Sequence, residues 1–500
     1  MRFYSKAFRI GVLSLTVSTL CACAVVTGKH ETLAQVDNAR LNLPEASGQT
    51  LAQWPQQGWW TQYNSPTLNA LIEQAMSDGP SLKVLAARID ASQNAADAVR
   101  KLSYPMGQVK VDWTGQEFFN THINPTDIAN QAFANMTTRP DGTFSTIPKN
   151  PSDQFIALTN ISAGISWDLD LWGHNRALYG AALGLSRAQT LEYEAARQGV
   201  IANIVGLHAQ IMAFTERANI VDKQIATQTT LRQRWLEREQ AGLQPTQNSV
   251  QVDMTLAQLV QLKQSLMAQK AVAHAQLAAL VGQTPEQLAE FLPEQTWQTL
   301  NLPQNIPVQI LGTRPDIAAA REYIVASTEQ VNAVKAEFYP NINIGLSTAL
   351  QLLNLQDILD FRGQNAAVKP AISLPIFNTI QLNAKLRQQQ AQLDNTVAQY
   401  NQTVFQAVSD AHQQLAQYRQ AQAYLTAQAR IVKDSQTLTD LSAQRYRAGM
   451  SPQMESLMYQ TATLREQDAL VMGYAMRRAQ EARLASSLGT EFSDLIAGKR

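Results

Sequence analysis

The side chains most often used for catalysis or metal binding are few in this sequence and poorly spaced for either role. The six histidines are His30, His122, His174, His208, His274 and His412. No pair of them has metal-ligand spacing such as HExxH, and the sequence has neither a GxSxG elbow nor a Walker loop. Asp168 and Asp170 have the spacing of a paired-carboxylate site. At strand spacing they share one face, so we expect them to line a polar interior or to cap the next helix. We therefore expect no catalytic residue, no metal site and no enzymatic activity.

The two cysteines, Cys21 and Cys23, both lie close to the N-terminus, which excludes a disulfide scaffold and a cysteine-ligated metal site. Residues 1–22 have the positive start and short apolar run of a secretory signal peptide. The run Leu20-Cys21-Ala22-Cys23 resembles the bacterial lipobox. The resemblance implies that Cys23 is the first mature residue and carries a covalent lipid such as palmitate, and that Ala24, in place of Asp, directs the chain to the outer membrane. The alternative is an ordinary signal peptide with two incidental cysteines.

The composition excludes several classes of protein. Lys and Arg total 40, as do Asp and Glu, so the chain lacks the basic surface of a nucleic-acid-binding protein. Low net charge together with 45% hydrophobic residues also argues against disorder. After residue 26 no apolar run reaches the ~18 residues of a membrane helix. If the mature chain spans a membrane, it must do so as a closed β-barrel, because open sheet edges are not tolerated in lipid.

The sequence contains an internal duplication. Residues 80–112 align without gaps on residues 315–347, and residues 238–282 align on residues 445–489. The aligned identities include Tyr104-Pro105 with Tyr339-Pro340, and Gly242 with Gly449. Two aligned blocks in the same order, with shared Pro and Gly, predict two copies of one structural unit.

Each half is expected to contain a helix, a β-hairpin and a long coiled-coil helical hairpin. In repeat 1, residues 80–283, strands are predicted at about 106–118 and 155–168 and the helical hairpin at about 174–283. In repeat 2, residues 315–489, strands are predicted at about 340–350 and 366–376 and the helical hairpin at about 379–489. Pro370 and Pro375 are expected near a strand end.

The periodicity within these segments predicts which side chains are buried. In the second half the residues from Leu393 to Ala411 include a coiled-coil series. Its members are Leu393, Val397, Tyr400, Val404, Ala407 and Ala411. One chain supplies four strands, too few to enclose a passage for solutes, so the strands predict an oligomer, and three chains would give twelve strands.

With this organisation, five local motifs resemble the outer membrane factor family of tripartite efflux systems, in its lipidated NodT-like branch. The motifs are 166–173 (SWDLDLWG), 314–317 (RPDI), 338–340 (FYP), 373–377 (SLPIF) and 445–449 (RYRAG). The resemblance implies a homotrimer with a twelve-stranded outer-membrane barrel and an α-helical periplasmic tunnel. It assigns residues 23–79 to an N-terminal anchor and equatorial segment, 284–314 to an equatorial linker and 490–500 to a C-terminal tail. The implied activity is passive export of drugs and other small molecules, delivered by an inner-membrane pump and a periplasmic adaptor.

The resemblance also points to the turns of the two helical hairpins as the functional site. The residues implied in adaptor contact are Gly242, Leu243, Pro245, Gly449, Met450 and Pro452. Some relatives carry Asp where this chain has Ser451, and the nearest carboxylate is Glu455. We therefore expect a gate closed by packing and hydrogen bonds, with Ser451 and Glu455 as candidates, although Glu455 is equally compatible with simple solvation. The outlet of a type I protein-secretion system and a lipid-anchored periplasmic adaptor remain alternatives. The segment 120–154 is expected to lie outside the cell.

Overall fold

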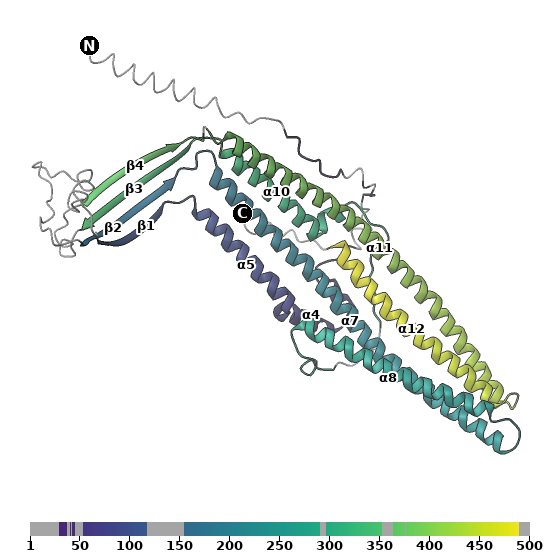
Figure 1. The fold of residues 1–500 in the computed structure, drawn as a ribbon. Helices are drawn as coiled ribbons and strands as arrows, with labels where there is room; N and C mark the ends of the chain where they lie inside the picture. Colours follow the sequence, from purple (N-terminus) through teal and green to yellow (C-terminus); the bar gives the residue numbers. More distant parts are fainter. Residues whose placement is uncertain are drawn as a thin grey trace, which may run out of the picture. The chain divides into compact units, whose positions relative to one another are not determined.

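The computed structural model describes residues 30–37, 41, 43–45, 54–117, 155–290, 297–352, 364–375 and 377–489. Cys23, the segment 120–154 and the C-terminal tail lie outside these residues. In the first half the elements are η2 (Trp59–Tyr63), α4 (Pro66–Asp78), α5 (Pro80–Lys101), β1 (Met106–Glu117), β2 (Phe155–Asp168), α7 (His174–Gln240) and α8 (Gln247–Val281) (Figure 1). In the second half they are α9 (Ile310–Thr313), α10 (Pro315–Ala336), β3 (Asn341–Leu352), β4 (Gln364–Ser373), α11 (Thr379–Arg447) and α12 (Gln453–Leu488).

The helices and strands expected from the duplication are present, with small shifts at their ends. The largest shift is in β4, which begins at Gln364 and ends at Ser373 rather than spanning 366–376. Pro370 lies within β4, opposite Ile344, rather than near the strand end. Its missing N–H is tolerated because β4 is an outer strand of the sheet, where one side of the backbone needs no partner from this chain.

The chain forms two compact units that do not coincide with the two repeats. One unit contains residues 94–183 and 326–393, together with the first residues of the chain. The other contains residues 33–93, 184–325 and 394–500. Each unit takes segments from both halves, so the duplication describes the order of elements in the sequence and not two separately folded bodies.

The first unit contains an antiparallel sheet with the strand order β1-β2-β3-β4 (Figure 1). The register places Val109 opposite Ala163, Ile165 opposite Leu346, and Leu346 opposite Val368. Because paired residues point to the same side of a sheet, this register sorts the side chains into two faces. The alternation predicted from the sequence is therefore confirmed.

The two faces of this sheet differ sharply in polarity. One face carries Val109, Val111, Trp113, Ile161, Ile165, Ile342, Ile344, Leu346, Val368 and Ile372. Several of these apolar side chains are largely exposed in the single chain, and Val109 is 75% exposed. The opposite face carries mainly small and polar side chains, among them Lys110, Asp112, Ser162, Ser166, Asn343, Ser347 and Lys369. The apolar face therefore needs a covering that the described residues of one chain do not provide.

The junction between β2 and α7 corrects the prediction for the paired carboxylates. Asp170 lies beyond the end of β2 with a backbone φ of 45°, so it does not share a strand face with Asp168. Its carboxylate oxygens accept the backbone N–H groups of Asn175 and Arg176 at 2.9 and 3.0 Å. Asp170 thus caps the N-terminus of α7, which was the second of the two expectations.

Aromatic residues from two of the sequence motifs meet beside this cap. The rings of Trp172 and Tyr339 stack with their centroids 4.8 Å apart. The indole N–H of Trp172 donates to the carbonyl oxygen of Pro340 at 2.8 Å. His174, the first residue of α7, lies with its Nδ1 2.9 Å from the carbonyl oxygen of Ala333. The SWDLDLWG and FYP motifs therefore join the β2–α7 junction of the first half to the α10–β3 junction of the second half.

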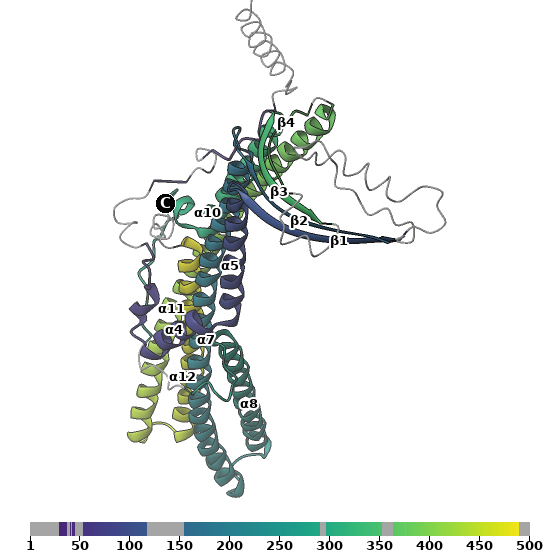
Figure 2. The same cartoon turned by 90° about the vertical axis from the view of Figure 1, so that its left-hand side faces the viewer.

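The second unit is built from long helices, and α8 and α12 each run beside α7 in it (Figure 2). Its core includes α7 residues such as Ile204 and Val205 and α12 residues such as Leu484 and Leu488, all fully buried. The coiled-coil series predicted on α11 is confirmed, since all six of its members are buried.

Within the described residues, no helix is both long enough and apolar enough to cross a membrane.

Candidate functional site: the tips of the helical hairpins

The turn between α7 and α8 has a specific backbone geometry. Gly242 has a φ of 70°, in the left-handed region that favours glycine. Its N–H donates to the carbonyl oxygen of Glu239 at 2.9 Å, and the N–H of Leu243 donates to that of Arg238 at 3.0 Å. This pair of bonds is a Schellman motif, which satisfies the last carbonyl groups of a helix.

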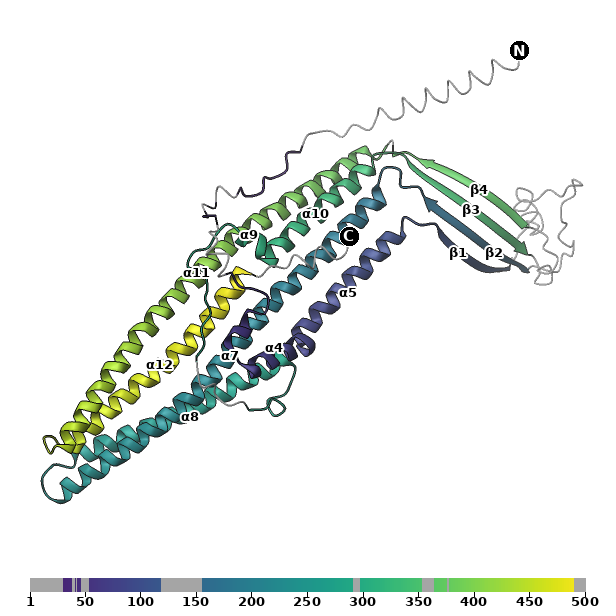
Figure 3. The same ribbon diagram turned by 180° about the vertical axis from the view of Figure 1, so that it is seen from behind.

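The turn between α11 and α12 repeats the same geometry. Gly449 has a φ of 72°. Its N–H donates to Tyr446 at 2.9 Å, and the N–H of Met450 donates to Arg445 at 2.9 Å. The duplication is therefore preserved down to the hydrogen bonds of the turns, which lie near one another in Figure 3. We call these two turns, residues 241–246 and 448–452, the tips.

Each tip presents a large apolar side chain at the same position of its motif. Leu243 is 65% exposed and Met450 is 73% exposed. In a Schellman motif this residue often packs back onto its own helix, which leaves it less exposed than here. The space beside the two glycines is open, since a Cβ built at either Gly242 or Gly449 meets no atom within 4 Å. Pro245 and Pro452 are also exposed at the tips. The six residues implied in adaptor contact thus lie in two equivalent, accessible turns.

A small apolar cluster lies directly behind the tips and joins the two hairpins. It consists of Leu231 on α7, Val252 on α8, and Met454 and Leu457 on α12. Trp235 and Leu256 pack against it. All four central residues are at most 9% exposed, so this tip cluster holds three helices of the two hairpins together.

Polar contacts between α7 and α12 continue this connection away from the tips. Arg234 Nε donates to Gln453 Oε1 at 2.8 Å, Gln228 Nε2 to Thr461 Oγ1 at 3.3 Å, and Arg217 binds both carboxylate oxygens of Asp468 at 2.8 and 3.0 Å. The Arg217–Asp468 pair is only 16% and 18% exposed, so its charges are shielded from solvent. Partial desolvation strengthens a bidentate pair of this kind.

The two gate candidates occupy different surroundings, Ser451 in the second tip and Glu455 just after it on α12. The hydroxyl oxygen of Ser451 is shielded and makes no hydrogen bond within the part of the chain that the structure describes. Glu455 lies in the first turn of α12, where a carboxylate is favoured by the helix dipole. Their roles at a gate stay predictions.

Sequence reasoning missed the side chains that connect the hairpins. Arg217 and Asp468 are 251 positions apart, and Arg234 and Gln453 are 219 positions apart. The aligned blocks of the duplication pair helices that are equivalent, whereas these contacts join helices that are not. A single sequence carries no signal for such a pairing.

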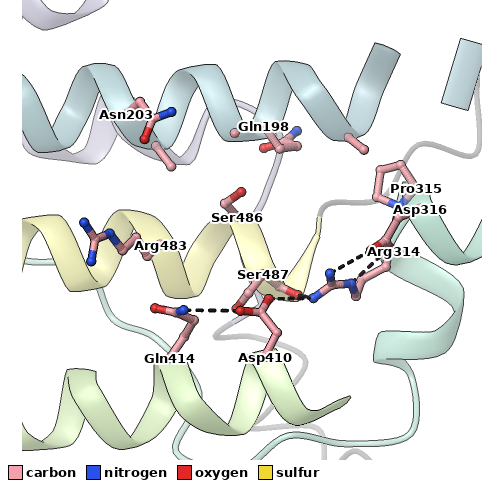
Figure 4. A pocket seen from close by; sticks show the side chains of 13 residues that line it. Gln198, Asn203, Arg314, Pro315, Asp316, Asp410, Gln414, Arg483, Ser486 and Ser487 are labelled. Carbon is pink, nitrogen blue, oxygen red and sulfur yellow. Dashed lines mark hydrogen bonds and ion pairs between the residues drawn. The ribbon is translucent and has the colours of Figure 1, made fainter. Parts of the chain in front are cut away.

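The RPDI motif, residues 314–317, connects three helices through the side chain of Arg314. Arg314 Nη2 pairs with Asp316 at 2.7 Å, and Nη1 contacts Asp410 on α11 at 3.2 Å and the carbonyl oxygen of Ser487 on α12 at 2.7 Å. These residues border a cavity of about 320 Å³, which Gln198 of α7 also lines (Figure 4). Arg314 therefore ties the start of α10 to α11 and to the C-terminal end of α12.

A buried charged cluster lies on α12, far from the tips in sequence. Glu481 is fully buried, accepts a hydrogen bond from the Tyr63 hydroxyl at 3.1 Å, and lies 3.3 Å from Arg477 Nε. Arg478, also fully buried, stacks over the rings of Tyr63 and Trp297 at 4.7 and 4.9 Å. Burial raises the pKa of Glu481 to about 7, although the two arginines oppose this shift. The cluster connects Tyr63, which precedes the first repeat, and Trp297, which follows it, to α12.

A buried histidine on α7 adjoins the same cluster. Burial, reinforced by the charge of Arg478, lowers the pKa of His208 to about 3, so this imidazole is neutral at physiological pH.

Across the described ranges, no group of three or more His, Cys, Asp or Glu side chains is arranged to hold a metal ion.

Comparisons with known proteins agree with this architecture. Residues 71–283 and 306–490 match the sequence profile of the outer membrane efflux protein family. The chain is 27% identical over 423 residues to the multidrug resistance outer membrane protein MdtQ of Escherichia coli O157:H7, covering 83% of each chain. It superposes on the outer membrane protein VceC of Vibrio cholerae with a TM-score of 0.70 at 24% identity, covering 88% of this chain and all of that one. It superposes on the outer-membrane channel OprN with a TM-score of 0.72 at 24% identity, covering 93% and 99%. Because the profile matches both halves of the duplication and most of the chain, this protein belongs to the outer membrane efflux protein family.

Proposed function

We propose that this chain is the exit duct of a tripartite efflux pump and carries drugs and other small molecules from the periplasm to the outside. As a member of its family, the chain is an outer-membrane efflux channel. Relatives named for multidrug resistance support small molecules as the cargo. We assign no chemical step to the chain, because passive conduction needs none.

The observation that carries the proposal is the two-faced sheet. A sheet with one apolar and one polar face suits a wall between lipid and water. Within the described residues, the outer edges of β1 and β4 have no partner strand. Three copies joined at these edges would close a twelve-stranded barrel with its apolar face toward lipid. The duct is therefore proposed to be a homotrimer.

The tips are the proposed contact for the periplasmic adaptor, which links the duct to an inner-membrane pump. Leu243 and Met450 are two exposed apolar side chains at equivalent positions of the hydrogen-bonded Schellman turns. Because the backbone of each turn is already hydrogen-bonded, binding through these side chains costs little backbone entropy. The adaptor is therefore proposed to present small apolar pockets that receive these two residues.

The gate is proposed to lie at the same end of the helices, with Ser451 and Glu455 near the passage. Three copies of Glu455 would form a ring of carboxylates, and such a ring favours cations. Single-channel recording of the Glu455→Gln variant tests this. We expect weaker cation preference with little change in conductance, and unchanged ion selectivity would remove Glu455 from the gate.

The lipid on Cys23 is proposed to anchor the mature chain in the outer membrane, although a single acylated cysteine adds to anchoring rather than supplying all of it. Labelling with radioactive palmitate tests the anchor. We expect the label in the parent protein and none in the Cys23→Ala variant.

An outlet for secreted proteins remains the second candidate. Deleting the gene and profiling susceptibility to a panel of toxic compounds separates the two functions. We expect susceptibility to rise for several compounds. Full retention of resistance, together with loss of a secreted protein from the medium, would instead support the secretion outlet.

A further inference from the structure

An extended N-terminal segment is attached to α11 by two side chains. The N–H of Leu33 donates to Asp394 Oδ1 at 2.9 Å. The N–H of Val36 donates to Asn401 Oδ1 at 2.7 Å, and Asn401 Nδ2 donates to the carbonyl oxygen of Ala34 at 3.1 Å. We call residues 33–36 the arm. Three backbone groups of the arm are thus satisfied by a single face of one helix.

The spacing of the two side chains matches the spacing of the arm. Asp394 and Asn401 are seven residues apart, which is two turns and about 10.5 Å along a helix. Leu33 and Val36 are three residues apart, which is about 10 Å in extended chain. The arm therefore runs along α11 in the same direction as the helix, in a fixed register.

The chemistry of Asn401 suits this role. Its amide offers one acceptor and one donor side by side, as a backbone peptide does in a β-ladder, and no carboxylate reproduces that pair. The arm itself buries little, since Leu33 is 48% exposed and three of its four residues are exposed. Apolar packing of the arm is therefore slight, and these hydrogen bonds hold it in its register.

We propose that Asp394 and Asn401 form a docking bracket that fixes the mature N-terminus on α11 and thereby limits how far the lipid on Cys23 can reach. The limit on the reach of the lipid rests on the lipid anchor of the proposed function. Asp394 lies fifteen residues after Thr379, the first residue of α11, which is about 22 Å along the helix. Ten chain steps from Cys23 to Leu33 span at most about 34 Å. The linker is therefore long enough to return to the strand end of α11, with about 12 Å in excess.

The bracket is tested first in a form without lipid, carrying Cys23→Ala behind an ordinary cleavable signal peptide. In this form Asn401→Ala should speed hydrogen–deuterium exchange at the amides of Leu33 and Val36 at least tenfold. Asn395→Ala is the matched control, because Asn395 is exposed on the same helix and should leave both amides protected. Equal exchange in the two variants would overturn the bracket.

The limit on reach is tested by deleting residues 25–30, which leaves four steps, or about 14 Å, between Cys23 and Leu33. In the lipidated protein this deletion should release the arm and raise its exchange to the level of Asn401→Ala. In the form without lipid the arm should stay protected. Palmitate incorporated with the arm still protected would overturn the limit on reach. If the parent protein takes up no palmitate, the proposed lipid anchor is wrong. The docking bracket is tested separately, by the Asn401→Ala result alone.

Discussion

Two methionines, Met450 at the second tip and Met454 just behind it on α12, separate the stability of the tips from their binding function. Met454 is 9% exposed within the tip cluster, whereas Met450, four residues earlier, is 73% exposed. Met454→Ala should therefore loosen the tips, while Met450→Ala should leave them intact and weaken capture of the adaptor. The two variants remove the same atoms, so each serves as the control for the other.

The size of the Met454 effect follows from its surroundings. Truncating a fully buried methionine to alanine costs about 2–5 kcal/mol, and the low end applies where neighbours can close the space. Met454 touches solvent at one side and lies near the end of the hairpins, so we expect about 2 kcal/mol. At 1.4 kcal/mol for each factor of ten, that loss makes local opening roughly 30-fold more frequent.

Hydrogen–deuterium exchange of the purified protein measures the opening. In Met454→Ala we expect exchange to rise roughly 30-fold in the last turns of α7 and the first turns of α12, because these amides exchange through the local opening. Met450→Ala should match the parent protein in exchange and bind the adaptor more weakly. The reasoning is refuted if both substitutions raise exchange equally, or if Met454→Ala leaves it unchanged.

Three further predictions concern other parts of the chain. Burial raises the pKa of Glu481 from 4.5 to about 7, so the stability that its protonated form contributes is fully present below pH 4.5 and is lost as the pH rises through 7. Between pH 4.5 and 7 the unfolding constant should therefore rise up to tenfold per pH unit. Chemical denaturation across this range should show the slope in the parent protein and a flatter one in Glu481→Gln. Val111→Lys places a charge on the apolar face of β1 at a cost of about 2–4 kcal/mol in the membrane, so it should reduce the folded protein recovered from outer membranes, whereas Gln108→Lys on the polar face should not. A double-mutant cycle with Arg217→Met and Asp468→Leu should give a coupling free energy of about 1.5–3 kcal/mol in denaturant unfolding, and a value near zero would mean that the pair contributes nothing.

Features that depend on local periodicity were predicted well from the sequence. The series from Leu393 to Ala411 is buried because its spacing of three and four residues keeps it on one face of a helix. The strand residues fall on alternate faces because a β-strand repeats every two residues. Gly242 and Gly449 end their helices because both take a left-handed conformation.

Features that depend on which segments meet in space were not predictable in the same way. Asp170 has strand-like spacing from Asp168, yet the chain leaves β2 before reaching it, and its carboxylate caps α7 instead. Glu481 and Tyr63 are 418 positions apart, so their contact arises only when the helices assemble. The lipid on Cys23 stays a prediction.

Whether the sheet separates lipid from a water-filled passage can be measured by blocking the passage from one face. Neighbouring residues of β3 point to opposite faces, with Leu346 on the apolar face and Ser347 on the polar face. The Cys23→Ala form, made behind an ordinary cleavable signal peptide, is given a single cysteine at either position and reconstituted in planar bilayers, and a charged, water-soluble thiol reagent is added during recording. We predict a stepwise loss of conductance for Ser347→Cys and none for Leu346→Cys. Block of Leu346→Cys alone, or the absence of any conductance from inserted protein, would show that the polar face of the sheet does not line a passage.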